Sequence, residues 1–376
     1  MPSSGDIPEC SWPSRARLSS PSELLALSAR ARRGRDFHMS PPSQISEEEY
    51  AAAATARPAS LGVCIPSTLP SAGGGFARIY FGKCASGGQS MVLKLQPDVA
   101  PHHIGTTEEV ALRLLNESAH GSPLPSVPRL HTAATAEIGG RRWHYMVMDR
   151  AGEREFGWCG RDQTEAALGR AFATALVGLV YMHSCGVAHL DVKPANILVD
   201  RAHSATLIDF GLSLMQREST RAAGTLPYIA PEICKRAVPH VRAYNTFKSD
   251  VWSLGISLFA AAAGFHPWAL ANVHEQSGRY RRVYNAQGRA AHLGFSATWL
   301  LLSTPLSDEL AATFPGMVGP ATEEELSPCL SSPAAPLLVK LLDGMLVIDP
   351  DRRPDLRGVC RLAHEWLAAV CPAEPR

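Results

Sequence analysis

"HLDVKPANILVD" (residues 189–200) is the stretch of this 376-residue sequence that says most about the fold. Asp191, Lys193 and Asn196 lie close together in it, directly before the apolar run Ile-Leu-Val. A long apolar segment with a helical pattern, residues 164–186, precedes the stretch and ends at a glycine. Two β-branched runs, "NILVD" and "ATLIDF", are joined by "RAHS". The polar residues are therefore predicted to lie on a loop between a long helix and a β-hairpin.

A second carboxylate follows the predicted hairpin. Asp209, in "IDFG", comes directly after the second run of the hairpin. Two carboxylates, an amide and an ammonium group together suit phosphoryl transfer. One carboxylate can receive the proton of an attacking hydroxyl, and the other carboxylate and the amide oxygen can hold Mg²⁺, a cation that prefers oxygen ligands. The ammonium group can offset charge on the transferred phosphoryl group.

Together with "LIDFG" and "GTLPYIAPE" (residues 224–232), this stretch resembles the eukaryotic protein kinase superfamily, serine/threonine type. The three motifs have the order and spacing of that family. The resemblance implies an α+β, bilobal fold, with a small β-rich N-lobe, a large helical C-lobe and the active site between them. The kinase domain would cover residues 61–370, as an N-lobe over 61–150 and a C-lobe over 151–370. Residues 1–60, rich in Ser, Pro, Ala and Arg, are predicted to be a mostly disordered tail.

The resemblance also implies a role for each polar residue of the loop. Asp191 would orient and deprotonate the acceptor hydroxyl, and Lys193 would stabilise the phosphoryl group in transfer. Asn196 and Asp209 would hold the metal, Mg²⁺, with Mn²⁺ as an alternative. The implied activity is transfer of the γ-phosphate of ATP to Ser/Thr hydroxyls of protein substrates.

Thr225 and Leu226 of "GTLPYIAPE" are expected to contact the protein substrate. Lys193 together with Thr225 is typical of serine/threonine members, and both would lie close to the catalytic base. Two further matches imply bracing roles. Asp250 in "KSDVWSLG" would hold the catalytic-loop backbone, and Arg353 in "DPDRRPD" would pair with the glutamate of "APE".

The resemblance predicts an ATP-binding lysine and its acidic partner upstream. Lys94, in the strand-like run "SMVLKLQ", matches the lysine. The following segment, residues 106–117, reads as a helix that a threonine could cap and whose first turn carries carboxylates. Glu109 is the expected partner of Lys94, by its position relative to the leucines, and Glu108 is the alternative.

The segment that would join the lobes is "YMVMDRAGERE" (residues 145–155). By its match to the family, Met148 would lie at the back of the adenine pocket, and the backbone of Asp149 and Ala151 would hydrogen-bond to adenine. A carboxylate of the same segment, Glu155 or Glu153, would reach the ribose.

The phosphate-covering loop departs from the family pattern G-x-G-x-x-G-x-V. "AGGGFARI" (residues 72–79) aligns with it, so that alanine replaces the first and the third glycine. Alanine disfavours positive φ, so ATP affinity is expected to suffer. The expected ATP contacts in this segment are Ala72, Gly73, Gly74, Gly75, Phe76, Ala77 and Ile79.

Leu190 is the second departure. Many family members carry arginine here, and a phosphate on the activation loop holds the charge of that arginine. Leucine carries no charge, so it avoids the energetic penalty of an unpaired buried charge. It also removes the means by which a phosphate on the activation loop would control activity. We therefore expect no obligatory activation-loop phosphorylation. The hydroxyls that would not be obligatory switch sites are Ser213, Ser219, Thr220 and Thr225.

Two other functions remain open from the sequence. The altered glycine loop would suit a pseudokinase scaffold, and the fold would suit a small-molecule phosphotransferase, although the "APE" segment favours a protein substrate. A net charge of +1 gives no sign of nucleic-acid binding, and the apolar run 251–265 is too short to span a bilayer. We expect an intracellular protein, in the cytoplasm or the nucleus, of a host cell if the chain is viral. The sequence leaves the oligomeric state open, and residues 269–335 match no motif.

Overall fold

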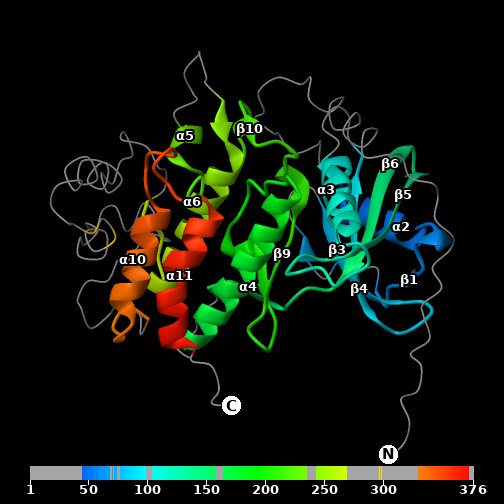
Figure 1. The fold of residues 1–376 in the computed structure, drawn as a ribbon. Helices are drawn as coiled ribbons and strands as arrows, with labels where there is room; N and C mark the ends of the chain where they lie inside the picture. Colours follow the sequence, from blue (N-terminus) through cyan, green and yellow to red (C-terminus); the bar gives the residue numbers. More distant parts are fainter. Residues whose placement is uncertain are drawn as a thin grey trace, which may run out of the picture. The chain divides into compact units, whose positions relative to one another are not determined.

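The chain forms two compact units, which are described one at a time. Unit 1 comprises Met1–Glu117 and Pro128–Arg150, and unit 2 comprises Ser118–Val127 and Ala151–Arg376. The elements of each unit are coloured along the sequence in Figure 1. The computed structural model describes residues 45–67, 70, 72–73, 77–98, 104–157, 164–234, 243–268, 296, 298 and 329–371.

Unit 1 is built on one antiparallel sheet. Its path is β1-β3-β4-β6-β5, and β2 pairs with β3 away from this path. The strands are β1 (Val63–Cys64), β2 (Ala72–Gly73), β3 (Arg78–Cys84), β4 (Ser90–Pro97), β5 (Leu130–Ile138) and β6 (Arg141–Asp149).

Helix α3 (Ile104–Ser118) follows β4 and begins two residues earlier than predicted, so its threonines lie inside its first turns rather than at the cap.

The alternation of side chains along β4 gives the sheet two buried faces. Leu93 and Leu95 point to one face, and Lys94 between them points to the other. The β5–β6 hairpin turns at Gly139 and Gly140, both at positive φ, as a two-residue turn of this type requires. Three of the predicted strands, near residues 76–83, 90–96 and 143–150, are therefore confirmed.

Residues 45–60 are folded, which corrects the prediction of a disordered tail up to residue 60. Helix α2 (Glu47–Thr55) begins at a capping box, in which Ser46 and Glu49 each accept a hydrogen bond from the other's backbone N–H. A short 3₁₀ turn, η1 (Ala59–Leu61), follows it. The aromatic and small side chains of α2 are what fix it, because they are buried in the core of unit 1. The first part of the predicted tail, residues 1–44, lies outside the described residues.

Unit 2 is mainly helical, as predicted for the second lobe. Its strands form two small antiparallel sheets, one of three strands and one of two. Its α-helices are α4 (Glu165–Ser184), α5 (Pro231–Cys234), α6 (Thr246–Ala263), α10 (Ala335–Met345) and α11 (Leu356–Val370). Its strands and 3₁₀ turns are β7 (Arg154–Glu155), η2 (Pro194–Asn196), β8 (Ile197–Val199), β9 (Ala205–Leu207), η3 (Phe210–Leu212), β10 (Glu218–Ser219) and β11 (Tyr244–Asn245).

The long helices of unit 2 begin and end where the sequence supplies caps. The Thr164 hydroxyl accepts the N–H of Ala167 at the start of α4, and Gly186 follows its end at positive φ. Asn245 caps α6, and Gly264 ends it in the left-handed conformation. The predicted long helix before the catalytic loop is thus confirmed, and the apolar run 251–265 belongs mostly to the buried helix α6.

Helix α4 is long and apolar enough to cross a membrane, as judged by length and composition, and no other helix of the described ranges is. It packs against α11 and β9 of the same unit, and ten of its residues are buried. These contacts are those of a core helix.

Candidate active site

The hairpin β8–β9 holds the metal-binding candidates at one end. Ile197 pairs with Leu207 in the ladder, and the N–H of Ile208 donates to the carbonyl of Asn196 at 2.9 Å. Asn196 thus precedes the first strand at the same end where Asp209 follows the second. The predicted hairpin is confirmed, and it brings together two residues that are separated in the sequence.

Asp191 is the centre of a hydrogen-bonded group in unit 2. Its side chain is 8% exposed, and its Oδ2 atom accepts from Lys193 Nζ at 2.8 Å and from Asn196 Nδ2 at 2.9 Å. The Thr225 hydroxyl donates to Asp191 Oδ1 at 2.7 Å and accepts from Lys193 Nζ at 2.8 Å. Lys193 and Thr225 thus lie close to Asp191, the residue that the sequence predicts to be the catalytic base. An acceptor hydroxyl that reaches Asp191 would meet a carboxylate whose direction three donors already fix.

A buried carboxylate holds the backbone that carries Asp191. Asp250, which is fully buried in α6, accepts the N–H of Leu190 at 2.7 Å and the N–H of His189 at 2.8 Å. Its Oδ2 atom also lies 2.8 Å from His183 Nε2. Charge-assisted bonds of this kind are stronger than neutral ones, so the catalytic loop is rigidly placed. The predicted bracing role of Asp250 is confirmed.

Leu190 itself takes a left-handed backbone conformation, with φ of 64°, and its side chain is 4% exposed. A non-glycine residue in this region is strained, by about 1–3 kcal/mol. The hydrogen bonds that the N–H groups of Leu190 and His189 donate to Asp250 offset this strain. The residue that departs from the family pattern is thus apolar and buried, and its backbone conformation is held by Asp250.

The donor set fits a hard divalent cation that also binds phosphate. Both hydrogen bonds of the Asn196 amide nitrogen go to Asp191, which turns the amide oxygen away from it. Among the described residues, no group of three or more His, Cys, Asp and Glu side chains could hold a metal by itself. Mg²⁺ does not require such a cage, because it is commonly bound by one or two protein oxygens together with substrate phosphates. Asn196 and Asp209 would supply those protein oxygens.

In unit 1, Lys94 pairs with Glu108, which corrects the prediction of Glu109. Lys94 Nζ lies 2.6 Å from Glu108 Oε2, and the two side chains are 10% and 1% exposed. Glu109 instead pairs with Arg113, one helical turn later, at 2.6 Å. Its other oxygen lies 3.4 Å from Nε2 of the buried His144, whose pKa burial lowers.

The buried stripe of α3 explains the correction. Glu108, Ala111, Leu112 and Leu115 are all buried, at the spacing i, i+3, i+4 and i+7 of one helix face. Glu109 lies beside this stripe. Counting back seven residues from Leu115 would have selected Glu108 from the sequence alone.

The other predicted ATP contacts of unit 1 lie on the sheet. Ala72 of β2 pairs with Ile79 of β3, and Ile79 faces Lys94 in the ladder between β3 and β4. Met148 is buried in β6 opposite Val92. Of the remaining predicted contacts, Gly73 lies in β2 and Ala77 directly before β3, whereas Gly74, Gly75 and Phe76 lie outside the described residues.

The predicted adenine contacts are Asp149, the last residue of β6, and Ala151, which precedes β7. The N–H of Asp149 donates to the carbonyl of Arg129 at 3.0 Å, so only its carbonyl oxygen could serve adenine. The Asp149 carboxylate contacts His131 Nε2 at 2.6 Å. Ala151 is the first residue of the second segment of unit 2. The adenine contacts, and the location of the site between the two units, stay predictions.

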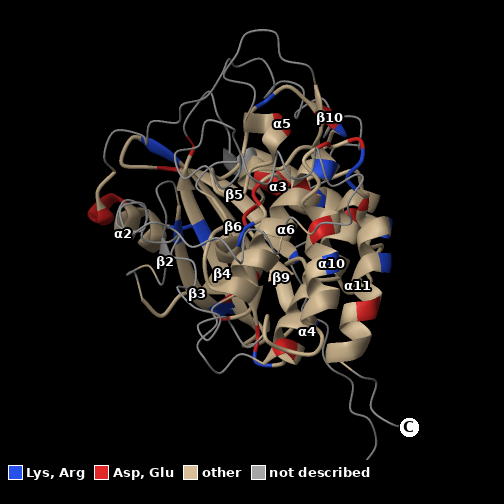
Figure 2. Ribbon diagram, turned by 90° about the vertical axis from the view of Figure 1, so that its left-hand side faces the viewer, with Lys and Arg blue, Asp and Glu red and all other residues tan. Residues whose placement is uncertain are grey.

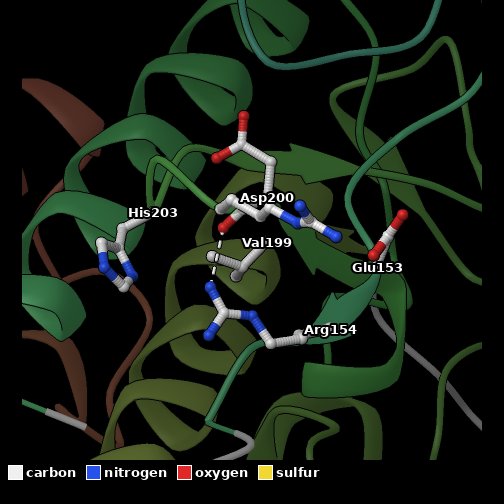
Figure 3. Close-up of a pocket in the computed structure, with 6 residues that line it drawn as sticks. Glu153, Arg154, Val199, Asp200 and His203 are labelled. Atoms are coloured by element: carbon white, nitrogen blue, oxygen red, sulfur yellow. Dashed lines mark hydrogen bonds between the residues drawn. The ribbon is translucent and has the colours of Figure 1, made fainter.

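A hollow of about 410 Å³ lies beside the turn between β8 and β9 in unit 2 (Figure 3). One wall is closed by a hydrogen bond of 2.9 Å from Arg154 to the carbonyl of Asp200. Of the two predicted ribose carboxylates, Glu153 lines this hollow, and Glu155 lies in β7 opposite Leu198. The hollow is lined by Glu153, Arg154, Val199, Asp200, Arg201 and His203, so it is separate from the group around Asp191.

The segment after η3 is tied to the start of α6, an arrangement that the sequence did not suggest. Strand β10 pairs with β11, with Glu218 opposite Asn245 and Ser219 opposite Tyr244. The Tyr244 hydroxyl donates to the carbonyl of Arg221 at 2.8 Å. Thr246 adds two bonds at the N-terminus of α6, from its hydroxyl to the Gln216 carbonyl at 2.6 Å and from its N–H to the Arg217 carbonyl at 2.9 Å.

A buried ion pair anchors the end of the same segment. Arg353, 1% exposed, donates to both carboxylate oxygens of Glu232, at 2.8 and 3.0 Å. Its remaining N–H groups bond to backbone carbonyls, including those of Val347 and Lys248. The predicted pair between Arg353 and the glutamate of "APE" is confirmed. Leu226, expected to contact the substrate, is 61% exposed on this segment.

The order of these parts matches a family model, the protein kinase domain, over residues 74–367. The chain belongs to the protein kinase family. The resemblance of its three motifs is therefore confirmed, as is the α+β bilobal fold that the family implies. ATP and a divalent metal are the cofactors that this family uses in general.

Several curated proteins that the chain is similar to are plant kinases. The chain is 33% identical over 225 residues to CBL-interacting protein kinase 4 of Oryza sativa subsp. japonica, an alignment that covers 56% of this chain and 47% of the relative. It is 30% identical over 229 residues to CBL-interacting serine/threonine-protein kinase 15 of Arabidopsis thaliana, covering 57% and 49% of the two chains. The chain thus spans about half the length of the curated relatives it matches.

Proposed function

We propose that this protein kinase is a serine/threonine kinase that transfers the γ-phosphate of Mg-ATP to hydroxyl groups of protein substrates. The observation that supports it most is the group of Asp191, Lys193 and Thr225, joined by hydrogen bonds of 2.7–2.8 Å. A carboxylate flanked by lysine and threonine is typical of serine/threonine members of the family. With Lys193 and Thr225 so close to Asp191, the space beside the carboxylate suits a short side chain that carries a hydroxyl group.

The proposed reaction assigns each residue one task. The acceptor oxygen forms a bond to the γ-phosphorus, the bond from that phosphorus to the β–γ bridging oxygen breaks, and ADP leaves. Asp191 orients the hydroxyl and receives its proton, while Lys193 offsets the negative charge on the transferred group. Asn196 and Asp209 would hold Mg²⁺, which neutralises charge on the phosphates when it is bound. Lys94, directed by Glu108, would hold the α- and β-phosphates.

The second part of the proposal is that activation-segment phosphorylation is not obligatory. Leu190 leaves no arginine in the catalytic loop that a phosphate would have to neutralise. The segment is held instead by the β10–β11 ladder and by the hydroxyls of Tyr244 and Thr246. Two of the segment's hydroxyl groups are also poor targets for a modifying enzyme, because Ser213 is fully buried and Ser219 is 9% exposed.

Transfer of labelled γ-phosphate from Mg-ATP to myelin basic protein tests the activity, with Asp191→Asn as the matched variant. Loss of transfer in the variant, with label on serine or threonine of the substrate, supports the proposal. Transfer that persists in the variant, or well-folded protein that transfers nothing, contradicts it. Nucleotide binding without transfer by the unmodified protein would favour a scaffold.

The independence from phosphorylation needs its own measurement. Protein treated with a phosphatase, and shown by mass spectrometry to carry no phosphate, should keep its transfer rate. Thr220→Ala should also keep it, because this side chain is exposed and makes no hydrogen bond within the described residues. A phosphatase-treated protein that loses most of its rate would refute this part alone.

We also propose that the chain acts inside the cell, in the cytoplasm or the nucleus, on protein partners rather than on nucleic acid or membranes. The near-neutral net charge of +1 supports this, because nucleic-acid and anionic membrane surfaces select strongly basic proteins. Fluorescence microscopy of a tagged chain tests it, and an exclusively membrane-bound signal would contradict it.

A further inference from the structure

Helix α2 covers the face of the unit 1 sheet that is opposite to α3. Tyr50, Ala53 and Ala54 of α2 are buried in one cluster with Tyr80 and Trp143 of the sheet. Lys94 and its partner Glu108 use the other face. Figure 1 shows the two helices on opposite sides of the strands. The helix lies before residue 74, where the match to the kinase family model begins.

The contacts of α2 with the sheet are specific as well as apolar. The Tyr145 hydroxyl donates to the carbonyl of Ala53 at 3.0 Å, and the rings of Tyr50 and Trp143 meet edge to face at 5.1 Å. Each aromatic pair of this kind adds to the energy of burial. Alanine at positions 53 and 54 lets the helix backbone come this close to the strands. The helix is therefore part of the folded unit.

One contact links α2 to the nucleotide side of the sheet. Arg78, the first residue of β3, donates to Glu47 through Nε at 2.9 Å and Nη2 at 2.5 Å. Its guanidinium group also lies 4.5 Å from the ring centre of Tyr50. The hydrogen bond from Arg78 lowers the pKa of Glu47, so this carboxylate is ionised at neutral pH. Figure 2 shows the acidic turn of α2 in red beside the sheet.

Arg78 lies between the described residues of the phosphate-covering segment. Ala77 precedes it, and Ile79, which follows it, faces Lys94 across the ladder. In the β2–β3 ladder Arg78 itself faces Gly73. A displacement of the start of β3 would therefore shift Ile79 relative to Lys94. It would also change the pairing of β3 with β2.

We propose that α2 positions the nucleotide-binding sheet of this chain, through Glu47 and Tyr50 acting on Arg78. Glu47, Tyr50 and Arg78 are positioning residues, because none of them is expected to touch ATP. This contact of Glu47 and Tyr50 with Arg78 is called the brace. The brace would compensate for the lower ATP affinity that is expected because alanine replaces two glycines of the phosphate-covering segment. The inference rests on the proposed function in one respect, namely that nucleotide binds to this sheet.

The test compares charge reversals on one helix. Glu47→Arg should raise the KM for ATP and the Kd for Mg-ADP by about threefold or more, since a partly exposed ion pair contributes modestly. The kcat should stay within about twofold, because the group around Asp191 is untouched. Glu48→Arg is the matched control, since Glu48 is exposed and makes no contact with Arg78. The double variant Glu47→Arg/Arg78→Glu should recover most of the nucleotide affinity.

Isothermal titration with Mg-ADP separates this proposal from the proposed function, because it needs no phosphate transfer. A Glu47→Arg protein with unchanged Kd, a Glu48→Arg protein with the same loss, or a double variant without recovery would each overturn the brace. Unmodified protein that binds no Mg-ADP would overturn it too. If Glu47→Arg does not fold, Glu47→Gln removes the charge alone and should raise the Kd in the same direction.

Discussion

Replacing Glu108 by glutamine should uncouple Lys94 from its partner at nearly constant shape. The carboxylate is 1% exposed and lies 2.6 Å from Lys94 Nζ, so the variant removes the charge of a carboxylate that pairs with this buried ammonium group. Removing one partner of a buried pair costs about 3–5 kcal/mol. We expect about 3 kcal/mol of lost stability, because glutamine still accepts a hydrogen bond.

Activity should fall with the ion pair. The kcat/KM for ATP should drop at least about tenfold, because Lys94 would no longer be directed toward the phosphates. The matched variant is Glu109→Gln, which removes the partly exposed pair with Arg113, at a cost of about 0.3–0.5 kcal/mol, and the longer contact of 3.4 Å with His144. Urea unfolding followed by circular dichroism, and initial rates over an ATP series, measure the two effects. Equal losses in both variants, or a larger loss in Glu109→Gln, would refute the assignment of Glu108.

Three other results are expected. Thr225→Ala should lower kcat about tenfold, and Thr225→Ser should restore it, because the hydroxyl joins Asp191 to Lys193; rates at saturating ATP decide this. Burial lowers the pKa of His144, so the folded protein favours the neutral imidazole. The free energy of unfolding should therefore be highest above pH 6.5, the pKa of the unfolded state, and should fall as the pH decreases below that value. Unfolding measured from about pH 7.5 to 5 should show a smaller decrease in His144→Gln. Arg353→Lys should cost about 2–4 kcal/mol in urea unfolding, because lysine cannot replace a buried bidentate pair; a loss under 0.5 kcal/mol would contradict this.

The catalytic loop was predictable because its chemistry is concentrated in a few adjacent residues. Asp191, Lys193 and Asn196 lie within one loop, and their mutual bonds follow from that closeness. Asp250 and Arg353 were found through the motifs around them. Thr225 was placed near Asp191 because Lys193 and Thr225 together match the serine/threonine members of the family.

The errors have a different origin, since they concern tertiary contacts. Glu108 and Glu109 are chemically alike, and only the phase of the buried stripe of α3 separates them. Helix α2 was assigned to a tail because residues 1–60 are rich in Ser, Pro, Ala and Arg and show no sustained helical or strand period. Its burial depends on the aromatic face that the sheet supplies through Tyr80, Trp143 and Tyr145. Pairing between β10 and β11 likewise joins residues about 26 positions apart, which no local pattern reports.

The tie between β10 and β11 has a consequence for how the cell would control this enzyme. Its hydrogen bonds come from Tyr244, Thr246 and the backbone, and these groups are present as soon as the chain has folded. If activation-segment phosphorylation is not obligatory, as proposed above, a segment ordered in this way would need no upstream enzyme and would offer no phosphate for an antagonist to remove. Output would then follow copy number, so synthesis and turnover of the protein would set the strength and the duration of its signal.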